Sequence, residues 1–351
     1  MRDRKLIAIL LVALLMIGLF TACGNQAAQP TPEPAPEAEE TPNVAPEIDD
    51  NEILESTYVR VGTLRGVLGM GMAALMHWAE AGETQNEYSF TLGGAPEEMT
   101  AGILSGALDI AAVPTNVAAT LYNVTAGEVK VITIGAFGAF YILDTTGEIE
   151  TVEDLRGRSI HSAAQGATPE FALAYILRGN DIDPQTDVNI VFHAENAELA
   201  SLMVAGKVEI GLLPQPFVTT VTNQSEAVHI ALDLTEEWSA ISPGSAMATS
   251  SIVVRTEFLE EHRDAVLLFI EEVARSIDFV NANIDEAAEL MEHFDIIPAA
   301  VARGAIPMSN LLHISGAEMI PLINGFLAVL YEANPQSVGG TMPDDAFFFL
   351  G

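Results

Sequence analysis

Several loops of the sequence carry glycine or polar residues that could contact a small ligand. The first is GTLRGVLGMG, from Gly62 to Gly71. Its glycines, Gly66 among them, allow the backbone to approach a ligand closely, and Arg65 could pair with an anionic or carbonyl group. We include Met70 of the same loop in the predicted site. The alternative is a flexible connector whose arginine is solvated.

A second group of candidates follows two short apolar runs. Pro114, Thr115 and Asn116 come after DIAAV, and Pro214 and Gln215 come after EIGLL. Their hydroxyl and amide groups would lie beside the N-terminus of a helix, where free backbone N–H groups favour acceptors. They could therefore bind a ligand, and simple helix capping is the alternative.

The stretch SAAQGAT ends in four further candidates, which are Gln165, Gly166, Ala167 and Thr168. Thr168 is a good N-cap and Pro169 suits the first helical position, so the amides before the helix could point towards a ligand. However, Glu170 in the same turn would partly complement the helix dipole itself. We therefore expect a neutral or singly charged solute rather than a multiply charged anion.

Four separate residues complete the predicted ligand site. Gly94 ends the run YSFTLGG, and Glu195 and Asn196 open a later helical stretch. Tyr141 could stack on a ring or cover it. An aromatic side chain at this position is equally compatible with core packing.

The sequence lacks the usual signals of enzyme chemistry. GMGMAA, from Gly69 to Ala74, matches GxGxxA, but the next predicted strand lacks the acidic residue that should hold a ribose. No GxxxxGK or GxSxG motif occurs. The seven histidines lack the HExxH spacing that places two zinc ligands on one helix face. We therefore expect no enzymatic activity, no cofactor and no metal site.

Short β-rich runs alternate with helical stretches from Thr57 onward, as in LDIAAV followed by TNVAATLYN. This alternation is typical of a mostly parallel sheet with helices on its faces. A second series with the same order begins after EIETVEDLRG. The stretch APEEMTAGILSGALDIAAVPTNVAATL, from Ala95, aligns without gaps with ENAELASLMVAGKVEIGLLPQPFVTTV, from Glu195. Unless this self-similarity arose by chance, the sequence predicts two similar α/β lobes.

The chain is expected to cross between the lobes twice, near residues 140–146 and near 243–251. We therefore assign residues 57–143 and 247–351 to the first lobe and 144–246 to the second. In open α/β sheets, ligands bind beyond the carboxyl ends of the strands. A pair of crossings makes a hinge that could close around such a ligand.

The N-terminus indicates export. Charged residues precede an apolar run from Leu6 to Phe20, which is the order of a secretory signal peptide, here residues 1–22. LFTACG resembles the lipobox of bacterial lipoproteins, although Phe20 replaces the more usual leucine, so Cys23 would carry a lipid. Residues 23–56, rich in Pro, Ala and Glu, predict a disordered tether. We expect a lipid-anchored protein on the outer face of the bacterial cytoplasmic membrane.

The composition narrows the range of partners. A formal net charge of −35, from 49 acidic and 14 basic residues, argues against nucleic acid, whose phosphates require clustered Lys and Arg. It also argues against a polybasic membrane-binding surface. Cys23 is the only cysteine, so no internal disulfide can form. We expect a monomer.

Five stretches carry a resemblance to a known family. They are VRVGTLRG, LSGALDIAAVPTN, YIL, TVEDLRGRSIHSAAQGATPEFAL and VAGKVEIGLLPQPFVTTV. Over about residues 57–255 the chain resembles the type 2 periplasmic binding proteins, specifically the solute-binding subunits of ABC importers in the nitrate, sulfonate, taurine and thiamine-precursor group. The resemblance implies a two-lobed α/β fold with two hinge crossings. It also supports a ligand contact for the SAAQGAT loop.

The same resemblance implies a function and leaves two alternatives. A protein of this group captures a small organic or anionic solute and delivers it to a permease, while a separate ATPase supplies the energy. One alternative is a ligand-sensing lipoprotein that serves no transporter. The other is an enzyme, because relatives of the same fold make the thiamine pyrimidine. The signal sequence and the single, lipid-bearing cysteine oppose the enzyme.

Overall fold

The structure is a computed structural model that describes residues 56–163 and 165–351. Residues 1–55 and residue 164 lie outside the described part, and with them the expected signal peptide, Cys23 and nearly all of the tether. The described residues belong to one compact unit. Within these ranges, no helix is both long enough and apolar enough to cross a membrane.

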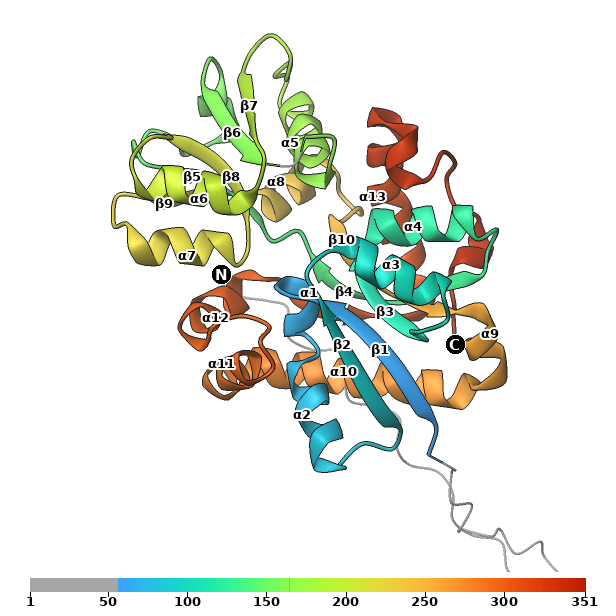
Figure 1. Cartoon of the computed structure of the whole chain (residues 1–351). Coiled ribbons are helices and arrows are strands. Elements are labelled where there is room, and N and C mark those ends of the chain that lie inside the picture. The colour runs from blue at the N-terminus through green and yellow to red at the C-terminus, as the bar shows by residue number, and fades with distance from the viewer. Residues whose placement is uncertain (1–55, 164) are drawn as a thin grey trace, which may run out of the picture. The chain divides into compact units, whose positions relative to one another are not determined.

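The first lobe is built on a six-stranded sheet with the order β11-β4-β10-β3-β1-β2 (Figure 1). Its strands are β1 (Tyr58–Leu64), β2 (Glu87–Gly93), β3 (Ile110–Pro114), β4 (Val129–Phe137), β10 (Ala248–Arg255) and β11 (Leu311–Ile314). Val59 and Val61 of β1 are fully buried, and branched side chains of this kind pack well on a pleated surface.

Helices pack on both faces of this sheet (Figure 1). They are α1 (Val67–Met70), α2 (Ala73–Ala81), α3 (Pro96–Leu104), α4 (Thr115–Val124), α9 (Thr256–Glu261), α10 (Arg263–Ala282), α11 (Ile284–His293), α12 (Ala299–Ala305) and α13 (Met319–Ala333). Short 3-10 turns follow at η2 (Ile306–Met308), η3 (Gly316–Glu318), η4 (Pro335–Val338) and η5 (Asp345–Phe347). Ala111 and Val113 of β3 pack in a core with α3, α4 and α13, whereas Ile110 and Ala112 pack in a core with α2, α10 and α11. The alternation follows from the two-residue period of a strand.

The second lobe is built on a five-stranded sheet with the order β7-β6-β8-β5-β9. Its strands are β5 (Phe140–Asp144), β6 (Ser159–Ala163), β7 (Asn189–His193), β8 (Ile210–Pro214) and β9 (His229–Asp233). Its helices are η1 (Val152–Leu155), α5 (Thr168–Gly179), α6 (Asn196–Val204), α7 (Phe217–Gln224) and α8 (Leu234–Ile241). The predicted two-lobed α/β class is confirmed.

The chain changes sheet twice, between β4 and β5 and between α8 and β10. Because β5 pairs with β8 and β9, the first change precedes the expected boundary after residue 143. Both sheets are mixed and not mostly parallel as expected, since four of the nine strand pairs among the described residues are parallel. The strands that follow the two crossings, β5 and β10, lie antiparallel to both of their neighbours. A hydrophobic pattern identifies a strand but does not give the direction in which it enters a sheet.

The internal repeat seen in the sequence is also a structural repeat. The pairs α3 and α6, and β3 and β8, have bounds that differ by one hundred positions at each end. In each lobe the helix is linked to the strand that follows it through a glycine in the left-handed region. The glycine is Gly106, with φ of 71°, between α3 and β3, and Gly206, with φ of 64°, between α6 and β8. Glycine adopts this conformation without the strain of a Cβ atom, which explains why both copies keep it.

An aromatic cluster joins the lobes beside the crossings. The ring of Trp238 in α8 lies 4.5 Å from that of Tyr175 in α5 and 5.9 Å from that of Phe326 in α13. Trp238 is fully buried, and its Nε1 donates a hydrogen bond to Ser245 Oγ at 3.3 Å. Helix α13 therefore packs against both lobes, and any opening of the lobes has to preserve or slide this contact.

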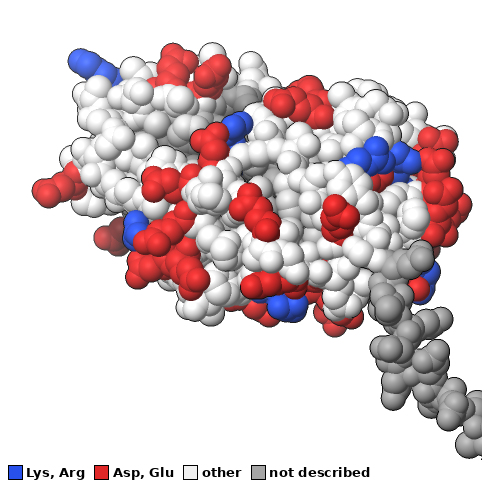
Figure 2. Space-filling view, turned by 60° about the horizontal axis from the view of Figure 1, so that its bottom comes forward, with Lys and Arg blue, Asp and Glu red and all other residues white. Residues whose placement is uncertain are grey.

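The described surface is acidic, as the composition predicts. Figure 2 shows Asp and Glu spread over the visible face, with the fewer Lys and Arg mostly next to them. Arg156 pairs with Asp187 at 2.6 Å and Arg303 pairs with Asp285 at 3.0 Å. Such exposed pairs contribute little to stability.

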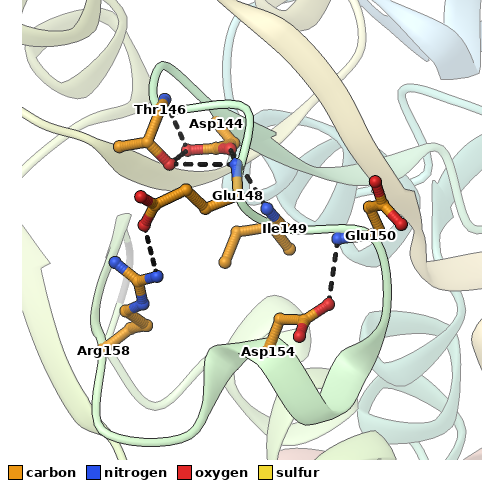
Figure 3. Close-up of polar contacts among 7 residues, drawn as sticks. All are labelled: Asp144, Thr146, Glu148, Ile149, Glu150, Asp154 and Arg158. Atoms are coloured by element: carbon orange, nitrogen blue, oxygen red, sulfur yellow. Dashed lines mark hydrogen bonds and ion pairs between the residues drawn. The ribbon is translucent and has the colours of Figure 1, made fainter.

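The carboxylate of Asp144 organises the loop after β5 (Figure 3). Its Oδ1 accepts hydrogen bonds from the backbone N–H and the hydroxyl of Thr146, both at 2.8 Å. Its Oδ2 accepts from the backbone N–H groups of Glu148 at 3.0 Å and Ile149 at 3.4 Å. Burial acts to raise the pKa of Asp144, but these hydrogen bonds to the ionised form outweigh burial and lower the pKa. Arg158 ties the loop to the next strand through Glu148, with Nη2 and Oε2 2.6 Å apart.

Candidate functional site

Contacts between the lobes define an interlobe seam. It comprises Gly66, Gly304, Met308 and Asn310 of the first lobe and Tyr141, Pro216, Thr219 and Thr235 of the second. The hydroxyl of Tyr141 donates to the carbonyl of Met308 at 2.7 Å, and Asn310 Nδ2 donates to Thr235 Oγ1 at 3.3 Å. A Cβ atom added at Gly304 would lie 2.8 Å from Thr219 Cγ2. Glycine at position 304 therefore allows α12 and α7 to approach closely.

Gln215 lies beside the seam at the end of β8, and its amide is only partly satisfied. Its Oε1 accepts hydrogen bonds from the hydroxyl of Thr219 at 2.9 Å and from the Thr219 backbone N–H at 3.4 Å. Because a backbone N–H can only donate, these contacts fix which end of the amide is oxygen. The side chain is 3% exposed, and its Nε2 has no hydrogen-bond partner among the described residues. A buried donor left without a partner costs about 1–3 kcal/mol, so a ligand acceptor here would recover that free energy.

The first predicted loop reaches the second lobe at Gly66. A Cβ atom added at Gly66 would lie 3.7 Å from Pro216 Cδ, next to Gln215. The backbone at Gly66 has φ of 84°, a left-handed conformation that favours glycine. Arg65 points elsewhere, since its Nη2 pairs with Asp295 Oδ2 at 2.8 Å and its Nε donates to the Asp295 carbonyl at 3.2 Å.

The candidates that follow β3 make their contacts within the first lobe. Thr115 is fully buried, and its Oγ1 lies 2.7 Å from Ser251 Oγ in a hydrogen bond. Asn116 Nδ2 donates to the carbonyl of Ser337 at 3.3 Å. Pro114 ends β3, and Met70 is fully buried in the core. These polar groups already have partners, in contrast to the amide nitrogen of Gln215.

The glycine amides of two predicted loops are also engaged. The N–H of Gly94 donates to Glu98 Oε1 at 2.9 Å, and the N–H of Gly166 donates to Glu170 Oε2 at 2.6 Å. In both cases a glutamate in the first turn of the helix accepts a hydrogen bond from the loop that precedes the helix. The predicted compensation of the helix N-terminus by Glu170 therefore takes the form of a direct hydrogen bond.

The loop before α5 differs by one residue from the prediction. Thr168 is the first residue of α5, and Ala167, with extended backbone, is its N-cap. The hydroxyl of Thr168 therefore does not cap α5, and no other described side chain accepts a hydrogen bond as its N-cap. Gln165 and Gly166 are exposed. In the corresponding loop before α6, Glu195 is the N-cap and is exposed, and Asn196 is the first helical residue.

Tyr141 packs in the core of the second lobe and also contacts the first lobe. The side chain is 4% exposed and packs in a core with Leu143, Leu213 and Val218, while its hydroxyl reaches across the seam to Met308. Burial and the neighbouring Asp233 raise the pKa of Tyr141 well above its ordinary value, so the hydroxyl stays a donor.

A pair of histidines escaped the sequence analysis. His161 Nδ1 and His193 Nε2 are 2.8 Å apart in a hydrogen bond, and the rings stack with centroids 5.1 Å apart. His193 Nδ1 lies 3.7 Å from Glu198 Oε1. Burial and the adjacent His193 lower the pKa of His161. Thirty-two positions separate the two histidines, and only the parallel pairing of β6 with β7 brings them together. The available signal was the repeat, which sets His193 against Gly93.

None of the five hollows found among the described residues is lined by a predicted ligand residue. One of them, of about 660 Å³, lies at the amino ends of β4 and α9 and is lined by Arg255, Glu128, Glu257 and Glu260 among others. Another, of about 500 Å³, lies between the lobes and is lined by Asp233, Thr235, Glu236, Ser239, Ala240 and Asn310. Among the described residues, no group of three or more His, Cys, Asp or Glu side chains is placed to hold a metal ion.

The two sheets, the two crossings and the seam between them form a two-lobed α/β architecture. A family model described as NMT1/THI5 like matches residues 95–287, which is more than half of the chain. The chain belongs to the NMT1/THI5-like family. No curated protein matches it.

Solved structures show the same fold. An ABC transporter protein from Parabacteroides distasonis is 21% identical, with a TM-score of 0.71 over 84% of this chain and 99% of that one. The periplasmic aliphatic sulphonate binding protein SsuA from Escherichia coli is 16% identical, with a TM-score of 0.66 over 81% and 96%. The periplasmic nitrate-binding protein NrtA from Synechocystis PCC 6803 is 13% identical, with a TM-score of 0.51 over 76% and 75%. The resemblance stated from sequence is thereby confirmed, and at these identities it establishes the fold.

Proposed function

We propose that the protein binds a small solute between its two lobes and delivers it to the permease of an ABC importer, without transforming it chemically. The family and the fold support a binding protein of this kind. The observation that carries the proposal is the Gln215 amide, which is buried beside the interlobe seam with an unused donor. Buried polar groups in native proteins nearly always have a partner, and a solute would supply one.

The seam also limits the chemistry of the solute. A donor at Gln215 Nε2 requires an acceptor, such as a carbonyl, carboxylate or sulfonate oxygen. Arg65 is already paired with Asp295, and the amides of Gly94 and Gly166 are held by glutamates. A neutral or singly charged solute therefore fits better than a multiply charged anion. The sixteen candidate residues remain the proposed binding set, with Gln215, Gly66 and Tyr141 placed at or beside the seam.

The setting of the protein belongs to the same proposal. The signal peptide and LFTACG would place the lipid-anchored chain, as a monomer, outside the bacterial cytoplasmic membrane. The tether to residue 56 would then hold the lobes near a permease, and the ATPase would be a separate subunit. The parts that would close on the solute are the lobes proposed from the sequence, 57–143 with 247–351 and 144–246, with the first boundary moved to precede β5.

A thermal-shift screen tests the proposal on the chain from Gly24 onward, against sulfonates, nitrate, bicarbonate, carboxylates, thiamine precursors and flavins. A ligand that binds only the folded protein raises the melting temperature. We expect a hit whose shift is lost in Gln215→Leu, which keeps the size of the side chain but removes the donor. Gln224→Leu, at an exposed position of α7, is the matched control and should keep the shift.

Two results would contradict the proposal. One is a hit that binds Gln215→Leu as tightly as the unchanged protein, because the amide would then not contact the solute. The other is chemical conversion of the hit during incubation, because a binding protein returns its solute unchanged.

A further inference from the structure

The helix caps of the two repeats differ in one respect. In the first lobe, Glu98 Oε1 accepts the N–H groups of Gly94 at 2.9 Å and Ala95 at 3.1 Å. In the second lobe, Glu198 Oε2 accepts the N–H of Ala194 at 3.2 Å, while its Oε1 lies 3.7 Å from His193 Nδ1. Glu198 therefore serves the helix cap and a histidine at once.

His193 in turn is bonded to His161, so the cap of α6 ends in a titrating pair. By the register of the strands, the positions that correspond to these histidines in the first lobe hold Gly93 and Gly62. The N–H···N bond between His161 and His193 needs one ring nitrogen with a proton and one without. Three contacts connect Ala194 to Glu198, Glu198 to His193 and His193 to His161. The last of them, the bond between the two rings, exists only while at least one imidazole is neutral.

Protonation acts on these contacts in two opposite steps. The first proton that the pair takes up leaves one imidazole neutral, so the hydrogen bond between the rings is kept. A second proton, on His161, puts two N–H groups against each other across 2.8 Å and two like charges in stacked rings. Burial and His193 already lower the pKa of His161, so this second step falls below the ordinary histidine range.

The groups around the pair leave these two steps intact. From α6, Glu198 faces His193 and Glu195 stands exposed at the N-cap. From β8, Gly211 lies beside His161 and brings no charge. At the start of α5, Glu170 is bonded to the Gly166 amide. No Lys or Arg forms an ion pair with Glu198 or with either histidine in the described part of the chain.

We propose that His161, His193 and Glu198 form a pH-responsive support for the loop at residues 194–196, so that acidification loosens the start of α6 and weakens solute binding by the second lobe. The effect on solute rests on the proposed function, because Glu195 and Asn196 belong to the proposed binding set. The loosening itself does not. The three side chains are positioning residues, and they act through the loop.

Hydrogen exchange followed by mass spectrometry tests the support without any solute, on the chain from Gly24 onward. Exchange in residues 194–204 is compared with exchange in residues 94–104, the repeat equivalent, between pH 8 and pH 5.5 after correction for intrinsic rates. We expect the ratio to rise on acidification, approaching tenfold per pH unit between the ordinary histidine pKa of about 6.5 and the lower pH of the second step, because opening takes up one proton in this range. His161→Asn, which cannot take up that proton, should show no such rise. His229→Asn, at an exposed position of β9, should behave as the unchanged protein.

A flat ratio in the unchanged protein, or the same rise in His161→Asn, overturns the proposal. If His161→Asn does not fold, the imidazole proton resonances of the unchanged protein decide. Two separated titration steps for the pair support the coupling, whereas independent titration of both rings near the ordinary histidine pKa overturns it. Failure to find any solute would count against the proposed function and leave the exchange result standing.

Discussion

Replacing Asp144 by asparagine should destabilise the second lobe in a pH-dependent way. The carboxylate is 1% exposed and accepts four hydrogen bonds from Thr146, Glu148 and Ile149 (Figure 3). An asparagine keeps one acceptor oxygen and turns an NH₂ group towards the remaining donors. Two hydrogen bonds to a charged acceptor are lost, at about 1.5 kcal/mol or more each, so we expect a loss of about 3 kcal/mol at pH 7.

The pH dependence follows from the lowered pKa of Asp144. A carboxyl group whose pKa is lower in the folded state stabilises the fold above its unfolded pKa, about 3.9, and this contribution is lost as the pH falls through the folded pKa. At low pH the unchanged protein therefore loses part of the stabilisation by the Asp144 carboxylate, which Asp144→Asn lacks at every pH. The difference between the two proteins should be full at pH 7 and should shrink below about pH 4.

Urea unfolding at pH 7 and at pH 3, followed by circular dichroism, measures this difference. Asp154→Asn is the matched control, because Asp154 also accepts backbone N–H groups in the same loop, those of Glu150 and Thr151, from a more accessible position. It should cost less than Asp144→Asn. An equal cost for the two variants at pH 7, or a difference for Asp144→Asn that stays constant down to pH 3, would refute the reasoning.

Three further substitutions test packing at the hinge and the seam. Phe326→Ala should lower the free energy of unfolding by about 3–5 kcal/mol and shift the fluorescence of Trp238, measured in a Trp78→Phe background; an unchanged emission spectrum would argue against the aromatic cluster. Tyr141→Phe should cost about 1 kcal/mol in urea unfolding, because the Met308 carbonyl loses its donor. Gly66→Ala should cost about 1–2 kcal/mol, since a Cβ atom is strained at φ of 84°; a neutral effect in thermal unfolding would contradict this.

Local pattern was sufficient to predict the elements of the second lobe and their relation to the first. The alternation of apolar runs with helical stretches located β3 with α4 and β8 with α7. The gapless alignment of the two series predicted a repeat, in which α3 and α6, and β3 and β8, indeed share their bounds at an offset of one hundred. These features could be read because strand and helix periods extend over neighbouring residues.

The partners of the candidate side chains could not be read in this way. Thr115 is bonded to Ser251, Arg65 to Asp295 and Asn116 to Ser337, each more than one hundred positions away in the sequence. From the sequence alone, all of these residues were predicted as ligand contacts alike. The structure distinguishes them from Gln215, whose Nε2 has no partner among the described residues.

By itself, the sequence determined a two-lobed α/β chain with an internal repeat, an acidic surface and an expected export signal, because each depends on composition or on the order of nearby residues. Only the tertiary structure decided the antiparallel placement of β5 and β10, the bond between His161 and His193, and the position of Gln215 beside the seam. These features depend on which distant segments become neighbours. Strand direction and long-range pairing are set by how whole elements pack, and no local period records them.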